Sequence, residues 1–505
     1  MVDLLNNLYL GFAVSLSLTN VFFCFVGVFV GTLIGVLPGI GPTATVAILI
    51  PSTFHLPPVT AVIMLAGIYY GAQYGGSTTT ILLNIPGEVS SVITSLDGYQ
   101  MALRGRAGPA LGIAAFGSFI AGSIATFGLA IVAPPLANMA LKFGAPEYTA
   151  LMVLGLITAT FLAQKSMLKA LAMVVLGLIL GTFGRETVTG FPRFTFGFYE
   201  LEDGLGFIPL IMGLFGISEV LLNVEEIIKG EMIAKGKIAG VLPSLEDWRR
   251  SILPILRGSV VGFILGVLPG GGALLGSLAS YTMEKKISRT PEKFGTGMIE
   301  GVAGPESANN SASQGAFVPL LCLGIPCNAV MALLVGALMI HGVQPGPLTM
   351  TKNPDLFWGI ITSMYAGNVI LLVLNLPLIA IWVKLLKVPY GILYPLILLF
   401  CIIGAFSLNN SILEIYLTIF FGVVGYIMRK VDYEAAPLVL AFVLGPMFED
   451  SLRQALLISR GDLMVFFNRP LSLIFLLAAS ALIVIPPMIS IFKKWKMTPI
   501  DSRDR

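Results

Sequence analysis

Charged side chains are scarce in this sequence and absent from long stretches of it. Asp, Glu, Lys and Arg make up 11% of the 505 residues, whereas a soluble domain carries roughly 25%. No charged residue occurs in the 84 positions between Asp3 and Glu88, and another uncharged run lies between Glu306 and Lys352. A soluble domain could not expose so much uncharged surface without aggregating, and about 20 apolar residues suffice for a membrane-spanning helix. The sequence therefore predicts a polytopic membrane protein.

The apolar runs also lack the pattern of a membrane β-barrel. Barrel strands alternate apolar and polar residues over about ten positions, whereas segments such as 370–381 and 471–485 are apolar on both faces. Because every backbone N–H and C=O must be paired inside the bilayer, we predict an all-α fold. No basic segment precedes the first apolar stretch, so we expect that stretch to be retained in the mature protein.

Several function classes are disfavoured by what is missing. The net charge of +3 is too small to indicate a nucleic-acid partner, and the four cysteines lie in apolar surroundings typical of buried thiols. His55 and His341 are the only histidines, too few for a His-based metal site, and no Gly-xxxx-Gly-Lys-[Ser/Thr] phosphate loop is present. We therefore expect no cofactor and no enzymatic activity. A membrane-embedded enzyme, which would need a nucleophile and base at membrane depth, is a remote alternative.

Apolar runs between charged or Pro/Gly-rich breaks predict about ten to twelve membrane segments, among them 251–268 with 272–283 and, next along the chain, 316–340. They fall into two halves, residues 1–228 and 251–492. The segment 229–250 between them holds eight charged residues and is expected to be a solvent-exposed linker. A basic tail, 493–505, follows the second half.

The two halves contain the same motifs in the same order. Glycines at spacing four occur twice, 231 residues apart, as Gly27, Gly31, Gly35 and Gly39 and as Gly258, Gly262, Gly266 and Gly270. Gly75 and Ile85-Pro86 recur at an offset of 240, as Gly315 and Ile325-Pro326. Two shared motifs with one small insertion between them indicate an internal repeat. We interpret the glycine ladders as faces on which another helix backbone packs closely.

The distribution of Lys and Arg indicates that the two copies are inverted. In the second copy the loop 285–293 carries four basic residues, whereas its counterpart at 51–58 carries none. After the second motif the bias reverses, with Arg104 and Arg106 in the first copy and only Lys352 in the second. Because cytoplasmic loops collect Lys and Arg, we expect corresponding loops on opposite sides of the membrane. Inverted repeats are a common plan of secondary transporters, whose sites form from broken helices near the midplane.

Each copy contains a Pro-Gly segment that cannot continue a regular helix, Pro38–Pro42 in the first and Pro269–Gly272 in the second. Each is a kink or the tip of a re-entrant hairpin, and basic residues on both flanks of the second segment favour the hairpin. Helix N-termini freed at such tips would present N–H groups to an anion.

Polar side chains cluster at the same place in both copies, before Pro86 and before Pro326. The first cluster comprises Gln73, Ser77, Thr78, Thr79, Thr80 and Asn84, and the second comprises Asn309, Asn310, Ser311, Ser313 and Gln314. Two interpretations stay open, because such clusters can bind a ligand or only bridge helices. The nearby carboxylates Glu88, Asp97, Glu300 and Glu306 are interpreted as solvated loop groups, with proton coupling as the alternative.

Four strings of this sequence resemble the large membrane subunit of tripartite tricarboxylate transporters, the TctA type. They are GTLIGVLPGIGPTAT (31–45), YGAQYGGSTTTILLNIPGEVSSVITSLDGYQMA (70–102), GVLPGGG (266–272) and GPESANNSASQGAFVPLLCLGIP (304–326). The resemblance implies a multi-pass subunit of the bacterial inner membrane that imports tricarboxylates, dicarboxylates or aromatic carboxylates as a secondary transporter. It also implies a coupling cation (proton or sodium), a small membrane subunit (TctB type) and a periplasmic solute-binding protein (TctC type).

By analogy with this family, the two tips and the two polar clusters would meet to form the substrate site. The residues expected there are Pro38, Gly39, Gly41, Ser77, Thr78, Thr79, Asn84, Gly270, Gly271, Gly272, Asn309, Asn310, Ser311 and Pro326. The second copy has Phe317 where the first has Ser77, so the half-sites are not equivalent. An elevator-like movement of this core would give alternating access. The alternatives are a stand-alone organic-anion carrier and a channel.

Overall fold

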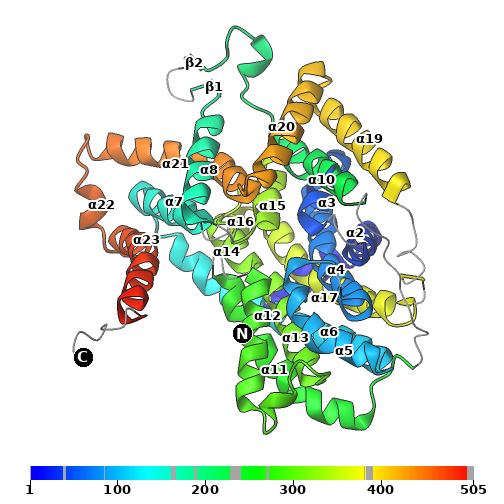
Figure 1. The fold of residues 1–505 in the computed structure, drawn as a ribbon. Helices are drawn as coiled ribbons and strands as arrows, with labels where there is room; N and C mark the ends of the chain where they lie inside the picture. The colour runs from blue at the N-terminus through cyan, green and yellow to red at the C-terminus, as the bar shows by residue number, and fades with distance from the viewer. Residues whose placement is uncertain are drawn as a thin grey trace, which may run out of the picture.

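The fold is almost entirely α-helical, as the sequence predicts. The computed structural model describes residues 2–37, 41–84, 86–160, 166–186, 190–227, 240–268, 272–379, 381–382 and 390–497. Within these ranges the strands are β1 (Gly184–Arg185) and β2 (Pro192–Arg193), a short antiparallel pair. Helices of the two halves lie among one another, since α4 and α6 of the first half pack against α13 and α17 of the second (Figure 1).

The first half runs from α1 to α10. Its helical elements are α1 (Val2–Ser15), α2 (Leu18–Val36), α3 (Gly41–Leu49), η1 (Ile50–Thr53), α4 (Pro58–Leu83), η2 (Val89–Ser91), α5 (Val92–Leu103), α6 (Ala107–Ala140), α7 (Ala145–Ala159), α8 (Met167–Gly181), η4 (Tyr199–Leu201), α9 (Phe207–Ile211), the π-helical η5 (Met212–Ile217) and α10 (Ser218–Ile227).

The second half runs from α11 to α23. Its helical elements are α11 (Leu245–Val267), α12 (Gly272–Ile287), η6 (Pro291–Lys293), α13 (Glu300–Gly315), α14 (Phe317–Leu323), α15 (Ala329–Ile340), α16 (Thr349–Lys352), α17 (Pro354–Asn375), α19 (Tyr390–Asn409), α20 (Ile412–Lys430), α21 (Ala435–Ile458), α22 (Val465–Asn468) and α23 (Pro470–Met497).

Local sequence explains where the central helices begin and end. α4 begins with Pro58, whose missing N–H is not needed in a first turn, and ends at Asn84, with a left-handed φ of 58°. α14 ends in the same way at the equivalent repeat position, Gly324, with φ 73°. α11 begins with a capping box, in which the side chains of Ser244 and Asp247 each accept the other's backbone N–H.

The glycine ladders pack one helix backbone directly on another in both halves. A Cβ added to Gly31 of α2 would lie 2.8 Å from Ile68 Cα of α4, and one added to Gly262 of α11 would lie 2.6 Å from Ala308 Cα of α13. The other glycines of the two ladders make equivalent contacts. An added Cβ would meet the backbone of Met64 at Gly27, of Ala72 at Gly35, of Gly304 at Gly258 and of Ala312 at Gly266. The ladders are therefore helix-packing faces, as predicted.

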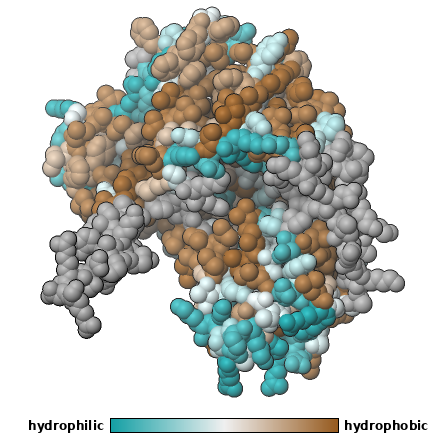
Figure 2. Space-filling view, in the orientation of Figure 1, coloured by the Kyte–Doolittle hydropathy of each residue, from teal (hydrophilic) through white to brown (hydrophobic). Residues whose placement is uncertain are grey.

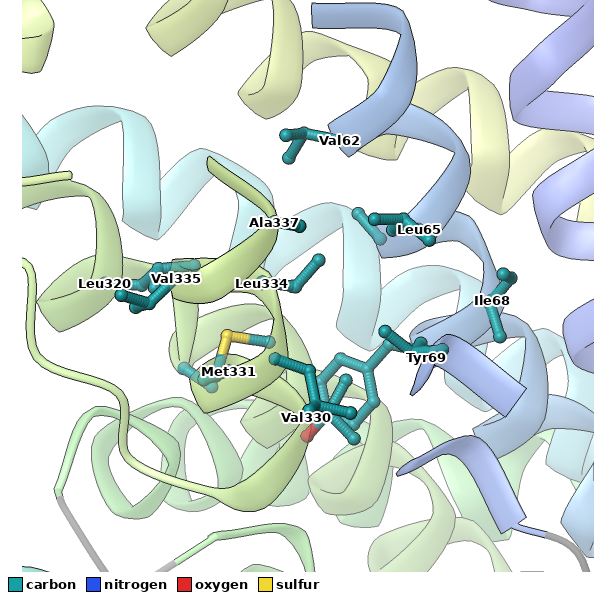
Figure 3. Close-up of a cluster of buried hydrophobic side chains, with 14 of the residues drawn as sticks. Val62, Leu65, Ile68, Tyr69, Leu320, Val330, Met331, Leu334, Val335 and Ala337 are labelled. Carbon is teal, nitrogen blue, oxygen red and sulfur yellow. The ribbon is translucent and has the colours of Figure 1, made fainter. Parts of the chain in front are cut away.

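The largest apolar core joins the two halves. Leu65 and Tyr69 of α4 face Val330 and Leu334 of α15, and all four are buried (Figure 3). Inside a bilayer such side chains hold helices together by close van der Waals packing, because lipid tails are as apolar as they are. Apolar packing thus places α4 of the first half beside α15 of the second.

The visible outer face is apolar over most of its area. Figure 2 shows hydrophobic residues across its upper and middle parts and a hydrophilic lower end, where Figure 1 shows α5 and α11. Phe127 on α6, Val260 on α11 and Phe420 on α20 are exposed. Seven helices within the described ranges are long and apolar enough to cross a membrane, and shorter apolar helices of 10–17 residues accompany them. The chain is a multi-pass membrane protein.

Two segments differ from the sequence prediction. The single apolar segment predicted at 316–340 is divided between α14 and α15, because Gly324 takes a left-handed φ and Pro326 removes a backbone donor. The polar stretch 300–315, where no membrane segment is predicted, forms α13 and is buried from Gly301 to Gly315. In the described ranges the structure thus offers seven full-length candidate spans and six shorter apolar helices, where the sequence predicts ten to twelve segments.

Candidate functional site

Helix α13 brings a polar sequence into the centre of the molecule. Its residues 304–315 read GPESANNSASQG, and all of them are buried. A helix this polar is stable there only when its side chains find hydrogen-bond partners. Those partners come from α4, η2, α5 and α6 of the first half and from α11 of the second. The two predicted polar clusters therefore meet at α13.

The Glu306 carboxylate of α13 is held by hydroxyl groups of the first half. Ser77 on α4 donates to one carboxylate oxygen, and Thr94 on α5 donates to the other. Glu306 is 0% exposed. Among the residues that the structure describes, Glu306 takes part in no ion pair. It is a buried, hydrogen-bonded carboxylate without a basic partner.

A second polar contact between the halves lies one turn further along α13. The Ser90 hydroxyl lies 2.7 Å from Asn309 Oδ1 and 3.1 Å from Gln73 Oε1. Glu88, the N-cap of η2, accepts the Ser90 backbone N–H at 2.8 Å and the Ser90 hydroxyl. Asn309 Nδ2 is buried and has no partner within the described part of the chain. This junction therefore leaves one amide donor free.

A small cavity adjoins these contacts between α4, α6 and α17. Its polar lining consists of Tyr74, Ser77 and Thr78 of α4, Ser118 of α6 and Asn375 of α17. Asn310 Nδ2 of α13 donates to Ser118 Oγ at 2.7 Å. The Tyr74 hydroxyl, Asn310 Oδ1 and Asn375 Oδ1 are buried without partners among the described residues. The cavity is polar, its lining is uncharged, and its volume of about 10 Å³ is at the lower limit for one water molecule.

Equivalent positions of the two halves contact each other crosswise. Asn328, the N-cap of α15, donates to the Tyr69 hydroxyl of α4 at 3.1 Å. Conversely, the Ser90 hydroxyl, two residues after the capping residue Glu88, lies 2.7 Å from the Asn309 amide of α13. At the repeat offset of 240, Glu88 corresponds to Asn328 and Tyr69 corresponds to Asn309. The capped start in each half thus contacts the long central helix of the other half.

The loops at the ends of these helices also contact residues of the other half. The Thr53 hydroxyl, in the loop between the first-half motifs, lies 3.2 Å from His341 Nε2 after α15. In the second half, backbone N–H groups of the loop 295–298 donate to Asp97 of α5 at 2.7–3.0 Å. The loop between the motifs of each half therefore lies against the end of the second motif of the other half.

One known protein family matches most of this sequence. The sequence matches the tripartite tricarboxylate transporter TctA family over residues 21–440, from α2 to the start of α21. The chain belongs to the TctA family. The match confirms the resemblance carried by the four sequence strings. This TctA-family chain is thus a membrane subunit of a transporter.

Two relatives of this TctA-family chain come from Agrobacterium vitis. An uncharacterized 52.8 kDa protein in the TAR-I ttuC' 3'region is 54% identical over 494 residues, covering 98% of both chains. An uncharacterized protein in the TAR-II ttuC' 3'region is 55% identical over 211 residues, covering 42% of this chain and 87% of that protein. No solved structure matches the chain.

The predicted site residues of this TctA-family chain have different surroundings. Ser77, Asn309 and Asn310 lie in the junction around Glu306, and Thr78 lines the cavity. Thr79 and Ser311 donate to backbone carbonyls of Gly35 and Ser259 on neighbouring helices, which is the helix-bridging alternative.

The remaining predicted positions lie at helix ends. Asn84 is exposed and is itself the left-handed C-cap of α4. Pro326 is buried and lies two residues after Gly324, the left-handed C-cap of α14. Gly41 and Gly272 begin α3 and α12 with φ 67° and 55°, and an added Cβ meets no atom within 4 Å at either position. Pro38, Gly39, Gly270 and Gly271 lie outside the described residues.

The interpretation of four carboxylates as solvated loop groups is wrong for two of them. Glu306 and Asp97 are both 0% exposed, because hydroxyls of α4 and α5 bind Glu306 and backbone N–H groups of the loop 295–298 bind Asp97, surroundings that the local sequence does not reveal. Glu300 is partly exposed and pairs with Arg250 at 2.8 Å. The sequence prediction also omits Thr94 and Ser90, although both lie inside the string 70–102 that resembles the family.

Proposed function

We propose that this chain is the permease subunit of a transporter that imports a small tri-, di- or aromatic carboxylate across the bacterial inner membrane. Import is by cation-coupled alternating access. A small membrane subunit of the TctB type and a periplasmic solute-binding protein of the TctC type complete the transporter, with the binding protein delivering substrate. The word tripartite in the family description supports these two partners.

The observation that carries the proposal is the set of unpaired donors at the junction of the two halves. Asn309 Nδ2 and the hydroxyls of Tyr74 and Ser307 are buried without partners among the described residues. Each such group costs roughly 1–3 kcal/mol while it stays unpaired, and a bound acceptor removes that cost. A carboxylate offers about four acceptor positions and so suits these donors, whereas the unpaired carbonyl oxygens of Asn310 and Asn375 at the same junction need a donor such as water.

The starts of α3 and α12 support an anionic ligand as well. Both helices begin at glycines, Gly41 and Gly272, where an added Cβ would meet no atom of the described residues within 4 Å. Helix N-termini carry unpaired N–H groups and partial positive charge, which favour anions. The lining of the cavity and both polar clusters lack Lys and Arg, so binding relies on neutral donors and on a co-transported cation.

Alternating access is supported by the crosswise contacts between the halves. A central helix of each half is hydrogen-bonded to the first residues of a capped helix of the other half, at equivalent repeat positions. Two inverted copies related in this way can exchange their conformations, which opens one side while it closes the other.

The test is uptake by the complete three-component transporter in proteoliposomes. A panel of citrate, a dicarboxylate and an aromatic carboxylate is offered under proton and sodium gradients imposed separately. We expect saturable, gradient-dependent uptake of one class that requires the binding protein. Uptake without the binding protein would indicate a stand-alone carrier, and non-saturable flux would indicate a channel. Absence of uptake for every carboxylate would overturn the proposal.

A further inference from the structure

Glu306 differs from two other buried carboxylates nearby. Asp97 accepts backbone N–H groups from the loop 295–298 and the Tyr281 hydroxyl at 3.0 Å. Glu284 accepts two hydrogen bonds from the Arg257 guanidinium, at 2.6 and 2.7 Å. Both are thus stabilised as anions. Glu306 has only the Ser77 and Thr94 hydroxyls among the described residues.

Within the described residues, no positive group of the other elements packed against α13 reaches the Glu306 carboxylate; Arg249 on α11 and Lys285 and Lys286 at the end of α12 are exposed. The titratable and charged side chains of these elements near this end are Tyr74 on α4, Glu88 on η2, Asp97 on α5, Arg250 and Arg257 on α11, Tyr281 and Glu284 on α12, and Cys322 on α14, while residues 107–140 of α6 have none. Arg250 pairs with Glu300, and Arg257 pairs with Glu284. An isolated carboxylate anion buried in such surroundings is costly. A neutralising cation on Glu306 removes that cost.

We propose that the Glu306 carboxyl group carries the coupling proton of the transport cycle. This inference rests on the proposed carboxylate import. Protonation forms one O–H bond on a carboxylate oxygen, and one of the two neighbouring hydroxyls then accepts that hydrogen, as hydroxyls can. Release breaks the same O–H bond and passes the proton to water. No other bond changes.

The position of Glu306 couples this proton to movement. The carboxyl group belongs to the second half, whereas both of its hydroxyl partners belong to the first half. Any displacement of one half against the other therefore removes these hydrogen bonds and changes the exposure of Glu306 to water. The cavity lined by Ser77 offers water a place beside this contact. Proton binding and release thus depend on which conformation the halves adopt.

A proton fits this setting better than a sodium ion. Both carboxylate oxygens are already in hydrogen-bond contact with a hydroxyl, and a proton adds to either oxygen without displacing a neighbour. A metal cation prefers several oxygen ligands around it, and the hydrogen bonds of Glu306 within the described residues bring only two hydroxyl oxygens to its carboxylate.

The decisive variant is Glu306→Gln in the complete transporter, which keeps the hydrogen-bonding shape but cannot release a proton. We expect it to exchange labelled for unlabelled carboxylate across the vesicle membrane and to lose accumulation driven by a pH gradient. Glu306→Asp should regain part of that accumulation. Glu300→Gln, on the same helix but in a partly exposed ion pair, is the matched control and should accumulate as the wild type does.

A separate measurement distinguishes this inference from the import proposal. Infrared difference spectra of the reconstituted chain, recorded across a pH titration, should contain a protonated-carboxyl C=O band that Glu306→Gln removes. That band in a chain that moves no carboxylate would overturn the import proposal and leave Glu306 as a proton site. Full pH-driven accumulation by Glu306→Gln, dependence on sodium alone, or a spectrum unchanged by the substitution would overturn the Glu306 assignment.

Discussion

Gly262 of α11 lies so close to Ala308 of α13 that a Cβ at the glycine would be 2.6 Å from the alanine Cα. The equivalent pair in the first half, Gly31 and Ile68, repeats this contact at 2.8 Å. The two offsets, 231 for the glycines and 240 for their partners, are those of the sequence motifs. The internal repeat is therefore also a repeat of backbone-on-backbone packing.

Gly262→Val should separate α11 from α13 and destabilise the protein. The added atoms would overlap backbone, which cannot rotate away as a side chain can, and overpacking typically costs about 1–3 kcal/mol or more. We expect a lower midpoint for thermal unfolding in detergent and less monodisperse protein. Val260→Ala changes an exposed side chain on the same helix and serves as the control. An unchanged midpoint for Gly262→Val would contradict the close packing.

Arg257→Met should destabilise the chain because it leaves Glu284 buried without its guanidinium partner. The Glu284 side chain is 3% exposed and that of Arg257 is 32% exposed. Breaking a buried pair costs about 3–5 kcal/mol, and the partial exposure of Arg257 places the expected loss at or below the lower end of that range. Unfolding by SDS in mixed micelles measures it.

The double variant Arg257→Met with Glu284→Gln is the matched comparison. Removing both charges leaves no unpaired buried ion, so it should recover much of the lost stability. Equal losses for the single and double variants would show that the ion pair is not the cause.

Asn309→Ala should weaken substrate binding in the transporter. If the free Asn309 Nδ2 donates to the carboxylate, its loss removes a hydrogen bond to a charged group worth about 1.5–3 kcal/mol, or roughly a ten- to hundredfold rise in apparent KM. Initial rates of uptake against substrate concentration measure this. Ser311→Ala removes a hydroxyl bonded to the Ser259 carbonyl and should leave KM near the wild-type value. Equal KM values for both variants would exclude Asn309 from the site.

His55→Cys and Arg289→Cys should react with an impermeant thiol reagent from opposite sides of the membrane. Both positions are exposed, and they lie in corresponding loops with opposite Lys/Arg content. The four native cysteines are buried and are replaced in the background used for labelling. Labelling of both positions from one side would contradict the inverted orientation of the repeats.

Much of the packing between helices could be predicted, whereas the centre of the site could only partly be predicted. The glycine ladders predict close approach of another backbone because glycines four residues apart lie on one helix face and have no side chains to hold a neighbour away. The polar clusters containing Ser77 and Asn309 were recognisable because each precedes the Ile-Pro pair of its half. The burial of Glu306 and Asp97 was not, because their local sequence is as polar as that of a surface loop.

The sequence by itself determined membrane embedding, the helical fold, the internal repeat and the family. These follow from composition, from long uncharged runs and from motifs, all of which are properties of the chain read in order. Only the tertiary structure decided which polar groups pair, since Ser77 and Glu306 are 229 positions apart. It also decided that α13 is buried, because burial depends on the donors that α4, α5 and α6 bring to it and not on its own hydropathy.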